Sequence, residues 1–156
     1  MLRFKSHKYF ISVFLTDSNM SYKFIEGITV ADLAFEAEGT SLKKLFPEQK
    51  KIFIIGFKFD KDVKKMLRQI VKIADVIIIT EFKGKTDMAI NASADASNLK
   101  TQISKLKSDA KVIIEKDLEK ALKKAIKLST IQQYNNPAII VVTGSLYLVG
   151  EVRNML

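Results

Sequence analysis

Ser145 is the residue best placed to do chemistry, because it stands at the joint between two apolar runs in VVTGSLYLVGEV (141–152). Gly144 before it allows a tight turn, and a serine at the start of a helix can cap the helix amides or leave them free for an anion. The pattern therefore predicts either a helix cap or a contact with a carboxylate or phosphate, and it favours neither. A nucleophilic role is not indicated, since the second glycine of a G-x-S-x-G turn is missing and the single histidine, His7, lies far away in the sequence.

Two carboxylates, Asp60 and Asp62, follow the apolar run that ends at Gly56 and precede a helical pattern. Acids at the start of a helix interact favourably with its dipole, so a cap and a first-turn acid explain them. A ligand role that faces a nucleotide is the alternative. One histidine and no cysteine cannot supply three nitrogen or sulfur ligands, and no carboxylate spacing suggests a metal site. We predict no metal site and no catalytic residue.

The tripeptide Gly84-Lys85-Thr86 resembles the end of a phosphate-binding P-loop. That motif needs another glycine five residues earlier, where the chain has Ile79 inside an apolar run. No G-x-G-x-x-G fingerprint is present either, so the sequence predicts no nucleotide cofactor bound by this chain alone.

The composition is typical of one globular domain. The chain has 156 residues, of which 47% are hydrophobic, and it contains no cysteine. It has no apolar run of the roughly 18 residues that a membrane span requires. Its first residues lack the features of a secretory signal. We therefore expect a cytoplasmic protein without disulfides or membrane contact.

The net charge of +9 suggests nucleic-acid binding as one interpretation. However, the lysines are spread along helical patterns such as KDVKKMLRQIVKI and KDLEKALKKAIKL, where they fill the polar face. This distribution favours a solvated surface, and we expect no nucleic-acid partner.

From residue 51 onward, short apolar runs alternate with amphipathic patterns. The runs predict buried strands, and apolar residues at intervals of three and four predict helices. The expected strands are 51–57, 75–82, 111–116 and 138–144, and the expected helices are 60–73, 96–107, 117–133 and 145–156.

Strands that are apolar throughout and are each followed by a helix indicate parallel pairing with both faces covered. The predicted fold is an open, mostly parallel, Rossmann-like α/β sheet with helices on both faces. Ligands of such sheets bind beyond the carboxyl ends of the strands. The first 50 residues are less regular, and predict a strand pair joined by DSNM (17–20) and a helix at 37–46.

Three segments resemble the C-terminal domain of folylpolyglutamate synthase and dihydrofolate synthase, in the Mur ligase superfamily. They are IIGFKFDKDVKKML (54–67), ADVIIITEF (74–82) and VVTGSLYLVGEVR (141–153). The last of them contains the family's most specific motif, T-G-S-L-Y-x-x-G-E-V-R. The matching residues are Gly56, Asp60, Lys61, Asp62, Thr143, Gly144, Ser145, Leu146, Tyr147, Gly150, Glu151, Val152 and Arg153.

The resemblance implies an ATP-dependent ligase that activates a folate or pteroate carboxylate as an acyl phosphate, which the amino group of glutamate then attacks. ATP and magnesium would be held by an N-terminal ATPase domain, which could be on another chain. The C-terminal domain that the present chain resembles would bind glutamate and folate, with Ser145 and Gly144 near the incoming glutamate.

The sequence departs from the family at the first strand of the domain, which ends in D-G-A-H-N-P in the family. The best counterpart starts at Asp32 and has Phe35 in place of the histidine. Residues 1–36 therefore form a divergent N-terminal segment, expected to add strands to the same domain, and 37–156 form the family-like α/β domain. The sequence is compatible with two hypotheses for the function of the chain. It is either a substrate-binding domain that needs an ATPase domain for turnover, or a degenerate binding or interaction module.

Overall fold

The structure of the chain, a computed structural model, describes residues 11–16, 22–25, 46–60, 62–83, 93–130 and 138–156. Its described strands form one sheet in the order β2-β1-β6-β3-β4-β5. The strands are β1 (Ile11–Thr16), β2 (Tyr22–Ile25), β3 (Lys51–Ile55), β4 (Val76–Ile79), β5 (Lys111–Ile114) and β6 (Ile139–Thr143). The helices are α3 (Lys64–Ile70), α4 (Ala96–Ser104), α5 (Leu118–Ser129) and α6 (Leu146–Met155).

The four strands from β3 to β6 are parallel, as the sequence predicts. At one edge the strand pair predicted in the first 50 residues is also confirmed, because β1 pairs antiparallel with both β2 and β6. The sheet is therefore mostly parallel, with an antiparallel hairpin beside β6. The helix predicted at 37–46 lies outside the described residues.

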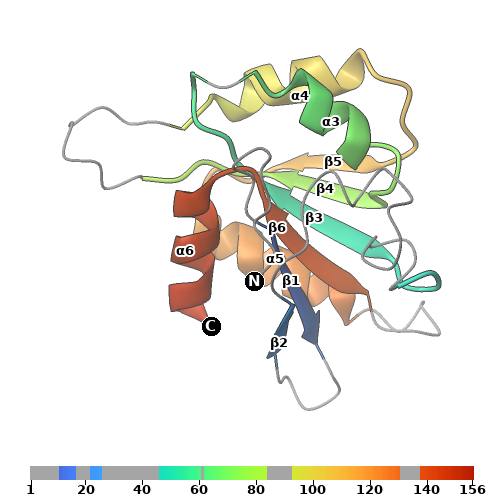
Figure 1. The fold of residues 1–156 in the computed structure, drawn as a ribbon, viewed down its shortest axis with the longest axis vertical. Coiled ribbons are helices and arrows are strands. Elements are labelled where there is room, and N and C mark those ends of the chain that lie inside the picture. Colours follow the sequence, from blue (N-terminus) through green and yellow to red (C-terminus); the bar gives the residue numbers. More distant parts are fainter. Residues whose placement is uncertain (1–10, 17–21, 26–45, 61, 84–92, 131–137) are drawn as a thin grey trace, which may run out of the picture.

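Each central strand contributes side chains to two separate cores. In β3, Phe53 and Ile55 pack on the face that carries α3 and α4, whereas Ile52 and Ile54 pack on the face that carries α5 and α6. This follows from the two-residue period of a strand, which turns successive side chains to opposite faces. Figure 1 shows the two pairs of helices on opposite sides of the sheet. The continuous apolar runs are thus explained by helices on both faces.

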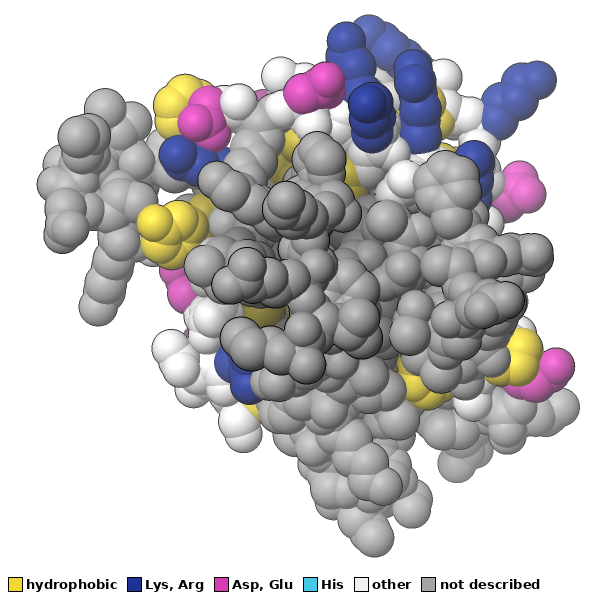
Figure 2. All heavy atoms as spheres, viewed as in Figure 1, with side chains coloured by type: hydrophobic (Ala, Val, Ile, Leu, Met, Phe, Trp, Pro, Cys, Tyr) yellow, Lys and Arg dark blue, Asp and Glu magenta, His cyan; other side chains and the backbone are white. Residues whose placement is uncertain are grey.

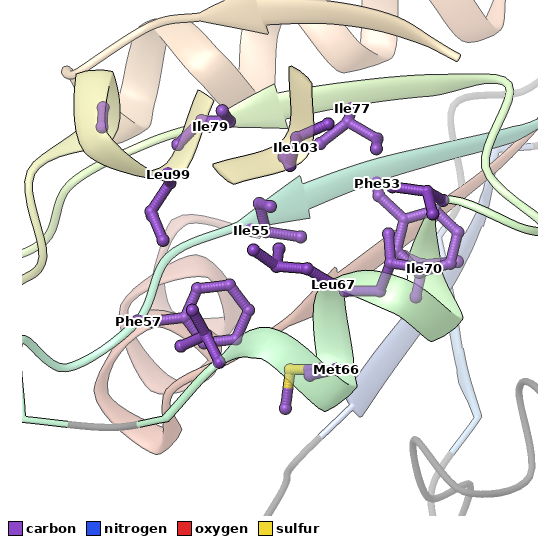
Figure 3. Close-up of a cluster of buried hydrophobic side chains, with 14 of the residues drawn as sticks. Phe53, Ile55, Phe57, Met66, Leu67, Ile70, Ile77, Ile79, Leu99 and Ile103 are labelled. Atoms are coloured by element: carbon purple, nitrogen blue, oxygen red, sulfur yellow. The ribbon is translucent and has the colours of Figure 1, made fainter. Parts of the chain in front are cut away.

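The first core gathers large side chains under α3. Figure 3 shows Phe53, Ile55 and Phe57 close to Met66, Leu67 and Ile70 of that helix. Phe53 and Ile70 are completely buried. The spacing of the buried α3 residues matches one helical face, so the core face was predictable from the sequence.

The predicted bounds of α3 were wrong, because the helix begins at Lys64 instead of residue 60. Its N-cap position is Val63, which makes no side-chain cap, and the first turn contains no acid. Asp62 lies outside the helix, and its Oδ1 accepts a hydrogen bond from the Lys64 amide at 3.1 Å. The N-cap and first-turn roles predicted for Asp60 and Asp62 are therefore wrong, because both residues precede the helix, although Asp62 still binds its first amide.

Among the described residues, none of the helices is both long and apolar enough to span a membrane.

Candidate functional site

Four polar segments meet at the carboxyl edge of the parallel strands. The register pairs Ile55 of β3 with Thr143 of β6 on one side and with Ile79 of β4 on the other, and it pairs Ile79 with Ile114 of β5. The residues that follow these four positions therefore lie along one edge of the sheet. This is the edge at which open α/β sheets bind ligands.

At the centre of this edge, Gly144 and Gly56 bring the ends of β6 and β3 unusually close together. Gly144 has a φ of 123°, a conformation that favours glycine. A Cβ added at Gly144 would overlap the carbonyl oxygen of Gly56. The Gly56 amide also donates a hydrogen bond to the Thr143 carbonyl, with N and O 3.4 Å apart. The predicted tight turn before Ser145 is therefore confirmed, and it depends on glycine at position 144.

Ser145 is the N-cap of α6 and is 7% exposed. Its Oγ accepts a hydrogen bond from the Tyr147 amide at 3.2 Å, and its carbonyl accepts the first helical bond from Val149 at 3.1 Å. The first amides of a helix have no acceptor within it, and they form the positive end of the helix dipole. The cap predicted for Ser145 is thus present, and the amides of residues 146 and 148 are left without an intrahelical acceptor beside it.

An aromatic pair adjoins the turn. The rings of Phe82, which follows β4, and Tyr147 stack with their centroids 6.4 Å apart and an angle of 19° between the planes. Phe82 is buried, while Tyr147 is 39% exposed. The Cβ position of Gly56 lies 3.3 Å from a Phe82 ring atom, so the aromatic pair is packed against the glycine turn. Tyr147 therefore gives the edge an exposed planar surface next to the α6 amides.

An ion-pair network joins the ends of β4 and β5. Lys116 Nζ lies 3.3 Å from Glu81 Oε1 and 3.4 Å from Asp95 Oδ1. The same Glu81 oxygen accepts a hydrogen bond from the Ala96 amide at 3.1 Å, so the network fixes the start of α4. Hydrogen bonds and charge from Glu81, followed by those from Asp95, raise the pKa of Lys116. The ammonium group therefore stays charged in the network.

A cavity of about 430 Å³ opens beside this network, between the ends of β4 and β5 and the helices α5 and α6. Its walls carry both signs of charge and also apolar side chains. The lining residues are Glu81, Phe82, Lys83, Ser93, Lys116, Asp117, Leu118, Glu119, Glu151 and Met155. Because Phe82 belongs to both, this cavity and the glycine turn are neighbouring parts of one edge.

Sequence reasoning missed Glu81, Lys116 and Asp95. The signal that drew attention to Asp60, a charged residue directly after an apolar strand, also applies to Glu81 in IIITEF and to Lys116 in VIIEKD. The pairing of the two depends on the register between β4 and β5, which a sequence pattern does not give.

The other candidate residues are not all brought to the turn. Asp60 is exposed, and its carboxylate pairs with Lys58 Nζ at 3.3 Å, while Asp62 binds the Lys64 amide. Asp32 and Gly84-Lys85-Thr86 lie outside the described residues. Within the described part of the chain, no three His, Cys, Asp or Glu side chains are grouped as a metal site requires.

The charge of Asp95 makes the start of α4 sensitive to pH. The Asn98 amide, and then Lys116, hold the pKa of Asp95 below 3.8. Because the pKa of Asp95 is lower in the folded chain than in the unfolded chain, its charged carboxylate stabilises the fold. This stabilisation is complete above the pKa of the unfolded chain, and it is lost as the pH falls through the pKa of the folded chain. We expect Asp95→Asn, which keeps a capping oxygen but removes the charge, to unfold at lower urea concentration than the unchanged chain at neutral pH.

The difference between the two proteins should begin to shrink below about pH 4, where the carboxylate of the unfolded chain takes up a proton, and should be smallest below the lowered pKa of the folded Asp95. Urea unfolding at neutral and at acidic pH measures it. A difference that is the same at both pH values would show that the charge of Asp95 is not the stabilising feature.

The sequence of residues 34–155 matches the family of dihydrofolate synthetase C-terminal domains. The structure resembles that of Mycobacterium tuberculosis folylpolyglutamate synthase complexed with ADP, with a TM-score of 0.65 and 18% identity, over 88% of this chain and 30% of that chain. The same synthase complexed with ADP and AMPPCP gives a TM-score of 0.55 and 20% identity, over 68% of this chain and 23% of that chain.

At these identities the structural likeness shows the fold. The chain spans less than a third of the length of the two synthase structures. A comparison with curated proteins gave no match.

Proposed function

Because the chain belongs to the family of dihydrofolate synthetase C-terminal domains, we propose that it is the glutamate- and substrate-binding domain of a folylpolyglutamate synthase-like ligase. The observation that carries this proposal is the position of Ser145, at the start of α6 and at the carboxyl edge of the sheet. The ligase acts in the cytoplasm and joins glutamate to a folate or pteroate carboxylate in an ATP-dependent reaction.

The chemistry of the α6 start supports a carboxylate ligand. A ten-residue helix directs the positive end of its dipole toward Ser145, and the amides of residues 146 and 148 have no intrahelical acceptor. A hydroxyl and backbone amides are the donors that bind carboxylates at helix starts. In the proposed role, the Ser145 hydroxyl donates a hydrogen bond to the carboxylate, while a lone pair of its oxygen still accepts the hydrogen bond from the Tyr147 amide.

Gly144 has a structural part in this role. A side chain at this position would overlap the Gly56 carbonyl, so the close turn depends on glycine. We propose that Gly144 allows the backbone to approach the substrate closely, and that Ser145 makes the contact with the substrate. Asp32, as the counterpart of the family's first-strand aspartate, would also bind substrate, and Asp60 and Asp62 would face the nucleotide.

Turnover requires ATP and magnesium, which we assign to an ATPase domain that carries the P-loop, on this or another chain. The described residues do not form a group that could hold magnesium, so no step is assigned to a metal on them. The part of this chain is to bind glutamate by its carboxylate and to hold its amino group toward the activated folate.

A binding module without catalysis is the second candidate. It is favoured by Phe35, which stands where the family has a histidine. Phenylalanine cannot donate or accept a proton, so a step that needs the histidine would be lost. Copurification of a P-loop chain would support the ligase, whereas glutamate binding without such a partner would support the module.

Calorimetric titration of L-glutamate tests the proposed contact. Removal of a hydrogen bond to a charged group costs about 1.5–3 kcal/mol, so Ser145→Ala should bind glutamate at least about tenfold more weakly than the unchanged chain. Magnesium with ATP should give no heat with this chain alone.

The matched control is Ser108→Ala, because the Ser108 hydroxyl also accepts a hydrogen bond from a backbone amide, that of Ala110 at 3.1 Å, but precedes β5 and so lies at the opposite edge of the sheet. Both substitutions remove a serine hydroxyl that binds a backbone amide, but only Ser145→Ala should weaken glutamate binding. Equal affinity of the unchanged chain and Ser145→Ala, or an equal loss in both variants, would contradict the assignment.

A further inference from the structure

A groove of about 360 Å³ runs between α3 and α4, on the face of the sheet opposite α5 and α6. Leu67 forms its buried floor, and Leu106 is partly exposed beside it. Lys64 and Arg68, one helical turn apart on α3, line one wall, and Gln102 and Lys105 line the other. The groove therefore has an apolar floor between cationic walls, and none of the described residues that line it is acidic.

The cations of this groove differ from those on the opposite face in how they are paired. On the α5 side, Lys123 pairs with Glu119 at 2.6 Å and Lys124 with Glu115 at 3.4 Å. Within the described part of the chain, no ion pair involves Lys64, Arg68 or Lys105. Figure 2 shows Lys and Arg side chains gathered over α3 and α4. Two lysines of α5 are thus paired with acids on the same face, whereas the cations that line the groove have no acidic partner among the described residues.

This combination fits a ligand that is both acidic and apolar. A cavity of about 150 Å³ is enough for a benzene ring, so a groove of 360 Å³ can accept an apolar side chain. Carboxylates on each side of that side chain would reach the cationic walls. A nucleic acid would use the cations but not the leucine floor, and the part of the lining that the structure describes contains no aromatic side chain on which a base could stack.

We propose that the groove between α3 and α4 is a docking site for an acidic segment of another protein, which inserts an apolar side chain between flanking carboxylates. The site is separate from the candidate ligand edge, since α6 and its Ser145 cap belong to the other face. The proposal therefore goes beyond the proposed function, and loss of one activity should leave the other intact.

Fluorescence anisotropy with a labelled peptide of three Glu-Leu-Glu-Glu repeats tests this assignment on the full chain. The peptide should bind, and a peptide with serine in place of leucine should bind about tenfold more weakly, because burial of a leucine side chain is worth about 1.5–3 kcal/mol. An oligothymidine of equal charge should bind more weakly than the leucine peptide.

The double variant Arg68→Glu/Lys105→Glu reverses one exposed charge on each wall, and should weaken binding of the leucine peptide at least about tenfold. Lys120→Glu/Lys127→Glu is the matched control, because it makes the same change in net charge on exposed positions of α5. The control should change the affinity less than about twofold.

Three results would overturn the docking site. They are equal weakening by the two double variants, tighter binding of the oligothymidine than of the leucine peptide, and absence of peptide binding. Circular dichroism of both variants checks that the helices are retained. Glutamate titration of the groove variant should be unchanged, which separates this test from that of Ser145.

Discussion

Replacement of Gly144 with alanine should lower the free energy of unfolding by about 3 kcal/mol or more, because two costs are combined at one position. The φ of 123° is strained for any residue with a side chain, and the new Cβ would overlap the Gly56 carbonyl oxygen. Relief of that overlap requires the ends of β3 and β6 to separate, although these strands are hydrogen-bonded at the centre of the sheet. Urea unfolding at equilibrium measures the loss.

Gly150→Ala is the control for this prediction. Gly150 lies inside α6, and a Cβ added there would meet no atom within 4 Å. Alanine in a helix interior is more favourable than glycine by about 0.5–1 kcal/mol, so this variant should be slightly more stable than the unchanged chain. Similar stabilities for Gly144→Ala and Gly150→Ala would show that the close turn is not required.

Phe53→Ala should also cause a large loss, of about 3–5 kcal/mol in the free energy of unfolding. The Phe53 side chain is completely buried in the core under α3 and α4. Its removal leaves a cavity whose walls are held by β3 and α3, so the surrounding side chains can fill it only in part. Urea unfolding monitored by circular dichroism measures this difference.

The matched control is Phe59→Ala, since Phe59 is 58% exposed. A surface substitution of this kind changes stability by about 0.5 kcal/mol or less. Comparable losses for the two phenylalanines would contradict the placement of the core between the sheet and α3.

The parallel sheet was predictable because its strands are apolar except for a polar residue at one end of some of them. In KIFII and IIVVT, neither face of the strand has a polar residue between the apolar ones, and the structure covers both faces with helices. The helical face of α3 was predictable for a similar reason, since Met66, Leu67 and Ile70 recur at helical spacing.

The length of α3 was not predictable, because apolar spacing continues beyond the helix. Val71 is also buried, yet the last turn tightens: the amides of Lys72 and Ile73 donate to carbonyls three residues earlier, those of Gln69 and Ile70. Bonds of this type end a helix and redirect the chain. The apolar spacing in the sequence therefore predicts which residues are buried. It does not predict the hydrogen bonds that determine where the helix ends.

The candidate site was predictable only in part. The cap formed by Ser145 follows from its place between a glycine and a helix, and the structure confirms it. The network of Glu81, Lys116 and Asp95 depends on contacts between segments that are far apart in the sequence. Contacts of this kind are set by strand register and helix packing, which no local pattern contains.

The resemblance to folylpolyglutamate and dihydrofolate synthases is confirmed by the match over residues 34–155. It rested on the terminal motif and on two further segments, of which 54–67 begins at the end of β3 and 74–82 contains the whole of β4. Asp32 precedes the matched residues, so its assignment as the counterpart of the family's aspartate stays a prediction.

The most direct test of the proposed function is to record which backbone amides of the chain shift in nitrogen-15 NMR spectra when L-glutamate is added. We expect the largest shifts at residues 145–148, at the start of α6, and we expect them to disappear in Ser145→Ala. Shifts centred on the start of α5 at residues 118–120, or no shifts at all, would contradict glutamate binding by Ser145.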